Sequence, residues 1–165
     1  MSFFKRFPYI ADYKIGGTPT TGIDLTRRTK ISEKNKNDES LFIYYDVMDG
    51  ETPEMIADRV YEDPSLYWVI LLFNEIFDID EHWPLSNYDL NNYVDRKYDD
   101  PFDTHHYESA ATGAIVDFDH VAYDRIKVTN KEYEIRLNDD KRRVKIPAPE
   151  FVPNIVDAHN QLIEK

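Results

Sequence analysis

The sequence predicts a small α+β fold in which one compact strand–helix–helix–strand unit is flanked by polar, irregular segments. Residues 41–86 contain most of the large apolar side chains. Two helix starts within them are marked by a capping residue followed by proline, whereas the flanks are rich in charge and poor in apolar runs. A chain of 165 residues can form one modest domain, or a smaller one with extended arms.

The N-terminal residues 1–40 are predicted to form an extended arm. Pro8 interrupts a run of aromatic residues, and the segment GGTPTTG at 16–22 has the composition of a turn. We expect a short strand at 24–31 and a charged loop at 32–40. Because the arm has too few apolar residues for a core of its own, we expect a partner to hold it.

A strand and a helix open the compact unit. Residues 41–47 (LFIYYDV) are β-branched and aromatic, which is typical of a strand. Thr52 can cap a helix that continues to Tyr61, with Pro53 at its first position, where the missing N–H costs nothing. Asp63–Pro64 repeats this signal and predicts a second helix.

The second helix is predicted to be buried from several sides, because apolar residues lie on all its faces. These residues are Leu66, Tyr67, Trp68, Val69, Ile70, Leu71, Leu72 and Phe73. Residues 83–85 (WPL) are then expected to return as a short strand beside 41–47. A capping box at Ser86 and Asp89 predicts a third helix.

The C-terminal part is predicted to hold a loop, a β-hairpin and a short tail helix. Residues 98–112 have the composition of a loop, and 114–118 resemble a short strand. Residues 133–137 and 143–146, joined by the turn-like Asn-Asp-Asp, predict the hairpin. Residues 154–165 follow as an amphipathic helix. The expected organisation is an arm (1–40), a core with its following helix (41–98), and the loop, hairpin and tail helix (99–165).

The composition argues against nucleic-acid and membrane partners. The net charge is −12, from 32 Asp and Glu against 20 Lys and Arg, so the chain repels a phosphate backbone despite a basic cluster at 141–143. The longest apolar run, 66–73, is too short to span a bilayer. Lys5, Arg6 and Pro8 interrupt the opening residues, so we expect no signal peptide.

The sequence contains no motif that points to catalysis. It has no cysteine, no G-x-S-x-G, no H-E-x-x-H and only 5 glycines, without a phosphate-binding loop. His105 and His106 lie among acidic residues and could suggest a small metal-dependent hydrolase, but adjacent histidines diverge in a strand or helix. We therefore expect a non-enzyme with no catalytic residues, no cofactor and no metal.

Three aromatic residues are open to two interpretations. Tyr67, Trp68 and Trp83 could form a platform that stacks on sugar rings. Their apolar neighbours (VILLF) make burial in the core the simpler interpretation, and we assign all three to the core.

Several segments carry a resemblance to known families. The strand, the two helices and W-P-L are similar to a LysM-type βααβ module. Within that class, the chain resembles the small wedge subunit of contractile-tailed phage baseplates, the family named after gene product fifty-three. The motifs are Y-Y-D (44–46), I-A-x-x-V-Y (56–61), D-P-x-L-Y-W-V-I-L-x-x-N (63–74) and W-P-L (83–85), with looser flanking likeness in F-P-Y-I (7–10), D-L-T-R-R (24–28) and the segment 133–151.

The resemblance implies a structural role. Such subunits help to join neighbouring wedges into the inner-baseplate ring around the tail tube. The implied partners are other wedge proteins, above all the large wedge subunit, with several copies in a symmetric assembly. The implied location is the virion tail baseplate, after assembly in the host cytoplasm. The alternative function is a LysM-type module that binds glycan such as peptidoglycan.

Partner contacts are expected in the segments that flank the core, because aromatic and arginine side chains are enriched at protein interfaces. The expected contact residues are Phe3, Phe7, Tyr9, Arg27, Arg28, Arg142, Arg143 and Phe151.

Overall fold

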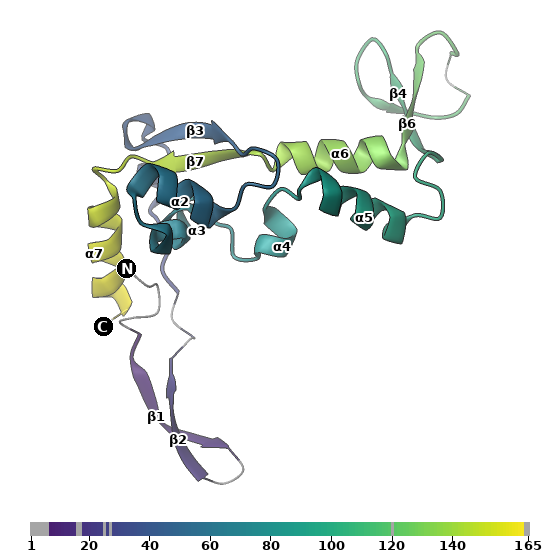
Figure 1. The fold of residues 1–165 in the computed structure, drawn as a ribbon. Coiled ribbons are helices and arrows are strands. Elements are labelled where there is room, and N and C mark those ends of the chain that lie inside the picture. Colours follow the sequence, from purple (N-terminus) through teal and green to yellow (C-terminus); the bar gives the residue numbers. More distant parts are fainter. Residues whose placement is uncertain (1–6, 16–17, 25, 27, 120, 164–165) are drawn as a thin grey trace. The chain divides into compact units, whose positions relative to one another are not determined.

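The computed structural model describes residues 7–15, 18–24, 26, 28–119 and 121–163. The fold is a mixture of helices and small sheets, which confirms the predicted α+β class (Figure 1). The strands are β1 (Tyr9–Ile15), β2 (Thr18–Ile23), β3 (Phe42–Asp46), β4 (Thr104–Ser109), β5 (Ile115–Val116), β6 (Arg125–Thr129) and β7 (Arg143–Pro147). The helices are α1 (Glu33–Lys36), α2 (Pro53–Tyr61), α3 (Tyr67–Phe73), α4 (Ile79–His82), α5 (Asn87–Lys97), α6 (Asn130–Asp140) and α7 (Val152–Ile163), with short 3-10 helices η1 (Glu39–Leu41) and η2 (Pro64–Leu66).

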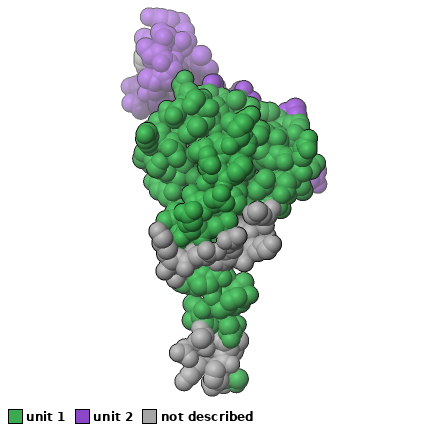
Figure 2. Space-filling view, turned by 90° about the vertical axis from the view of Figure 1, so that its left-hand side faces the viewer, with its two compact units in different colours: residues 1–45, 51–82, 144–165 green, residues 46–50, 83–143 purple. Residues whose placement is uncertain are grey.

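The chain folds as two compact units (Figure 2). Unit 1 comprises residues 1–45, 51–82 and 144–165, and unit 2 comprises 46–50 and 83–143. Most of unit 2 is therefore inserted in the sequence between α4 and β7 of unit 1.

The predicted helix starts of the core are confirmed. Thr52 Oγ1 accepts a hydrogen bond from the Met55 amide at 3.3 Å, and Pro53 occupies the first turn of α2. Asp63 Oδ1 accepts from the Ser65 amide at 2.9 Å where η2 leads into α3. These side chains satisfy amides that the first turn of a helix leaves without partners.

The central helix α3 is buried on all sides, as predicted. Every residue from Trp68 to Phe73 is less than one tenth exposed. Trp68, Val69, Leu72 and Phe73 share a core cluster with Ile31, Phe42 and the buried face of α7 (Val152, Ile155 and Val156). The tail helix supplies that face and begins two residues earlier than predicted.

The predicted returning strand at 83–85 is wrong. Trp83 and Pro84 are buried, but both backbone groups of Leu85 bind the Asn138 side chain: its N–H donates to Oδ1 (2.7 Å) and its C=O accepts from Nδ2 (3.0 Å). These bonds replace the ladder bonds of a strand, and Pro84 has no N–H to donate.

The strand that pairs with β3 is β7. The Ala148 amide bonds to the Leu41 carbonyl (2.8 Å) at one end of the pair, and the Val47 amide bonds to the Arg142 carbonyl (2.9 Å) at the other, so the strands are antiparallel. The order strand, helix, helix, strand is present, but its last strand follows the inserted unit. The likeness of this order to a LysM module stays a prediction.

The side chain of Asn74 binds the edge of β7 that faces away from β3. Its Nδ2 donates to the Lys145 carbonyl (2.7 Å) and its Oδ1 accepts from the Lys145 amide (2.8 Å), while Nδ2 also reaches the Ile70 carbonyl (2.8 Å). The side chain therefore satisfies the backbone of Lys145 as a neighbouring strand would.

The predicted C-terminal hairpin is wrong in its first half. Residues 133–137 lie in α6, which begins at a capping box: Thr129 accepts from the Glu132 amide, and Glu132 binds the Thr129 amide in return. The short alternation in YEIRL is compatible with a strand, but the box upstream fixes a helix. Asn138 to Asp140 then form the last turn of that helix, and only β7 remains of the hairpin.

Unit 2 contains a three-stranded sheet that is largely absent from the prediction. Its order is β5–β4–β6, and β4 lies within the expected loop 98–112. The strand expected at 114–118 is confirmed as the short β5. The helix predicted after Ser86 is confirmed as α5, and Ser86 is its N-cap, because its Oγ accepts from the Asp89 amide at 3.1 Å. The Asp89 carboxylate accepts from the Ser86 hydroxyl (2.6 Å), so the reciprocal backbone bond of a capping box is replaced by a bond between side chains.

The arm also differs from the prediction. It contains the antiparallel hairpin β1–β2, and residues 24, 26 and 28–31 lie outside any strand. The expected charged loop holds α1 and η1, each begun by a side-chain cap, Ser32 and Asp38 respectively.

Candidate partner-contact surfaces

The hairpin β1–β2 presents apolar side chains to solvent. Tyr9 lies opposite Ile23 and Ile10 lies opposite Gly22. Directly opposite residues of an antiparallel pair point to the same face, so Tyr9 and Ile23 form one cross-strand pair. Their exposed fractions are 71% and 43%, and that of Ile10 is 40%. A hairpin of two strands is marginally stable on its own in water, so this element gains by being covered.

The predicted contact residues differ in how far they are exposed to solvent. Tyr9, Arg28 and Arg143 are exposed. Phe7 is buried with its ring centroid 6.1 Å from that of His159, and Phe151 is half-buried against the core cluster. Phe3 and Arg27 lie outside the described residues.

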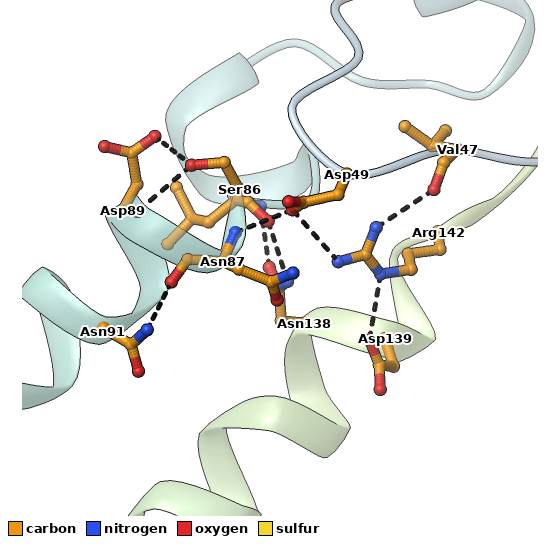
Figure 3. A network of polar contacts seen from close by, with 10 residues as sticks. Val47, Asp49, Ser86, Asn87, Asp89, Asn91, Asn138, Asp139 and Arg142 are labelled. Atoms are coloured by element: carbon orange, nitrogen blue, oxygen red, sulfur yellow. Dashed lines mark hydrogen bonds and ion pairs between the residues drawn. The ribbon is translucent and has the colours of Figure 1, made fainter.

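Arg142 is held by contacts within unit 2 (Figure 3). Its guanidinium donates to the Val47 carbonyl (3.1 Å) and to Asp139 Oδ1 (2.9 Å), and lies 4.0 Å from Asp49 Oδ1. Asp49 in turn accepts from the Asn87 amide at 2.7 Å. The side chain is only 20% exposed, and it ties the segment 46–50 to the end of α6.

A second apolar surface, absent from the predicted contact residues, lies at the end of the unit 2 sheet. We call it the sheet tip. Its large apolar side chains and their exposed fractions are Ile115 (74%), Phe118 (70%), Tyr123 (91%) and Ile126 (49%). The alternation of apolar and acidic residues in I-V-D-F-D (115–119) is the signal that could have identified it.

Apolar side chains of the tip lie on both faces of the sheet. Glu108 of the middle strand lies opposite both Ile115 and Ile126, so these two flank it on one face. On the other face the Arg125 guanidinium stacks on the Tyr107 ring (4.8 Å) and the Phe118 ring (4.4 Å). The stack holds Phe118 in place although most of its surface is open to water.

The proposed sugar platform is not exposed. Trp68 and Trp83 are 5% and 6% exposed, and Tyr67 is partly buried against the core. A stacking site needs an open aromatic face, so these residues have the positions of a core, as predicted.

The two histidines are held by neighbouring side chains of unit 2. Their Nδ1 atoms lie 2.8 Å apart, the His105 ring stacks on Tyr133 at 3.9 Å, and His106 Nε2 lies 3.1 Å from Glu108. Within the described ranges no group of three or more potential metal ligands converges.

Unit 1 also has a cavity of about 260 Å³ between α7 and the segment 29–35. Its wall includes a buried hydrogen bond between Thr29 Oγ1 and His159 Nδ1 at 2.9 Å. The Lys30 ammonium at its edge pairs with Glu33 and Glu75. The remaining lining is mainly apolar.

Comparison with known proteins assigns the chain to a family. No helix in the described part of the chain is long and apolar enough to cross a membrane. A search of curated proteins returned no match. The family model described as base plate wedge protein 53 matches residues 1–100, which includes the hairpin, α2, α3 and α5. The match spans more than half of the 165 residues, and the chain therefore belongs to the phage base plate wedge protein 53 family.

Proposed function

We propose that this chain joins neighbouring wedges of the inner baseplate by protein–protein contacts, and that the hairpin β1–β2 is its joining element. Membership of the family makes the chain a structural component of the phage tail baseplate. The joining of wedges, the use of the hairpin and the absence of catalysis are our proposals.

The exposed pair Tyr9–Ile23 carries the proposal. A two-stranded ladder with open apolar side chains is a poor independent structure, and it becomes favourable when a partner covers it. Interface cores are enriched in tyrosine and other aromatic residues, which provide area together with a polar tip.

The remaining surface of the chain would bind the large wedge subunit of its own wedge. Arg143 is exposed at the start of β7, and Phe151 directly precedes α7. Several copies would then occupy equivalent places in a symmetric ring. Assembly of the wedges would take place in the host cytoplasm, before the virion is complete.

The double variant Tyr9→Ser, Ile23→Ser tests the hairpin. We expect wedges that contain it to form and to retain the large wedge subunit, but to join into rings with affinity reduced about 30-fold, as loss of a ~2 kcal/mol hot spot implies. Sedimentation velocity of reconstituted wedges would measure the joining.

The matched control is Tyr88→Ser, which removes an aromatic ring that is 75% exposed on α5. Wedges with this variant should join like the wild type. Unimpaired joining by the double variant would show that the hairpin is not the joining element. Failure of the chain to bind the large wedge subunit would contradict the second part of the proposal.

A further inference from the structure

Positive and negative residues are concentrated in different segments of the chain, although its net charge is −12. Residues 1–28 contain five Lys or Arg against two Asp, a net charge of +3. Residues 98–129, which contain the three-stranded sheet, have seven Asp or Glu against two Lys or Arg, a net charge of −5. An arm of one sign and a sheet of the other attract each other when they belong to different copies.

The acidic segment also contains the sheet tip. Asp117 and Asp119 are exposed, flank Phe118 along the chain and follow Ile115 by two and four residues. Asp124 is engaged locally, because it accepts from Ser109 Oγ (2.8 Å) and from the Ala111 amide (2.9 Å). The tip therefore combines open apolar area with carboxylates that point into solvent.

The two cations of β6 do not neutralise these exposed carboxylates. Arg125 stacks on Tyr107 and Phe118, and Lys127 Nζ donates to the Phe102 carbonyl at 3.0 Å. Glu108, the acid on the opposite face, forms two hydrogen bonds with Arg136 Nη1 (2.7 and 2.9 Å). The acidic character that remains at the tip comes mainly from Asp117 and Asp119.

The hairpin has the complementary character. It offers the apolar pair Tyr9–Ile23, and the exposed Arg28 follows β2 in the sequence. Lys30 is not counted here, because its ammonium already pairs with Glu33 and Glu75.

We infer that the N-terminal hairpin of one copy docks on the sheet tip of a second copy of this chain. Tyr9 and Ile23 would cover Ile115 and Ile126, while Arg28 faces Asp117 and Asp119. The contact is heterologous, because it joins different patches of the two copies, and it generates a closed ring when the rotation between copies closes. This inference rests on the proposed function and names what the joining element meets in the next wedge.

The lack of cysteine in the chain permits a direct test by disulfide formation. Ile23→Cys and Ile126→Cys would be made in separate full-length chains, mixed and oxidised. We expect about tenfold more heterodimer than in a mixture of Ile23→Cys with Tyr88→Cys, because docking raises the effective concentration of one thiol beside the other. The yield should fall as salt is added, since the contact pairs opposite charges.

A yield no higher than that of the Tyr88→Cys control would overturn the inference. A pair of charge-reversal variants checks that the cysteines themselves do not cause the result. Arg28→Asp in the Ile23→Cys chain should abolish the excess of heterodimer over the control. Asp119→Arg in the Ile126→Cys chain should then restore it. If neither substitution changes the yield, the tip is not the docking site.

The outcomes also separate this inference from the proposed function. If the thiols do not pair but Tyr9→Ser, Ile23→Ser still prevents the joining of wedges, the hairpin joins wedges through some other surface. If the thiols pair while that variant joins wedges normally, copies associate but do not hold the wedges together.

Discussion

Replacement of Trp68 by alanine is expected to lower the free energy of unfolding of unit 1 by about 3–5 kcal/mol, as truncation of a large buried aromatic side chain does. Trp68 is 5% exposed and belongs to the cluster in which α3 packs against α7. Its ring centroid lies 4.8 Å from that of His159, so the truncation also removes an aromatic contact. Denaturant unfolding followed by circular dichroism would measure the change.

Tyr88→Ala is the control for this prediction, because it removes an aromatic ring of α5 that is 75% exposed. Its cost should stay within about 0.5 kcal/mol, as for most surface positions. Unchanged unfolding of the Trp68 variant, together with loss of binding to chitin or peptidoglycan fragments, would place Trp68 in a glycan site and not in the core.

Replacement of Asn74 by alanine is expected to lower the free energy of unfolding of unit 1 by about 2–3 kcal/mol, because three hydrogen bonds are lost and the partly buried N–H and C=O of Lys145 lose their partner. Two of these partners are the N–H and C=O of Lys145, on the edge of β7 that faces away from β3. The third is the Ile70 carbonyl near the end of α3. Urea unfolding would measure the loss.

Two further variants identify the cause. Asn74→Asp keeps the size of the side chain but removes its N–H donors and brings a carboxylate near two carbonyls, so it should destabilise at least as much as alanine. Asn91→Ala removes an exposed asparagine that donates only to a carbonyl of its own helix, Asn87 (2.8 Å), and should be nearly neutral. If Asn74→Asp is as stable as the wild type, the amide bonds to β7 do not hold the strand.

Local signals in the sequence predict most of unit 1. The caps at Thr52 and Asp63 locate α2 and the start of η2 because a capping side chain and a following proline act within a single turn. The all-round apolar character of α3 predicts its burial, and the structure supplies the cover from α7. These features depend on neighbours in the sequence or on composition.

The pairing of strands could not be obtained in the same way. Nothing near 83–85 indicates that Asn138, far along the chain, would occupy the backbone of Leu85. The same holds for β7, which returns to β3 only after the whole of unit 2. Long-range pairing is set by tertiary contacts that a pattern of residues does not encode locally.

The sequence also contains the signal that predicts helix α6. The capping box of Thr129 and Glu132 stands in the sequence just upstream of the segment interpreted as a strand. A five-residue alternation fits both structures, whereas a capping box with reciprocal bonds is specific to a helix start. The sheet tip is hard to predict for a related reason, because its acidic residues give the segment the composition of a loop.

The motif that carries the family resemblance is explained mainly by the fold. Asp63 caps the start of η2, Asn74 holds β7, and Trp68 and Trp83 are buried. These four residues build the scaffold. The exposed hairpin also lies within the matched residues 1–100, and burial in the scaffold does not explain its open side chains.

Amide hydrogen exchange in the hairpin tests the proposed joining role most directly. The measurement compares residues 9–15 and 18–23 in the purified chain and in joined wedges. We predict fast exchange in the free chain, because an isolated two-stranded ladder opens readily, and strong protection once wedges have joined. Equal exchange in the two states, with new protection confined to other elements, would contradict a joining role for the hairpin.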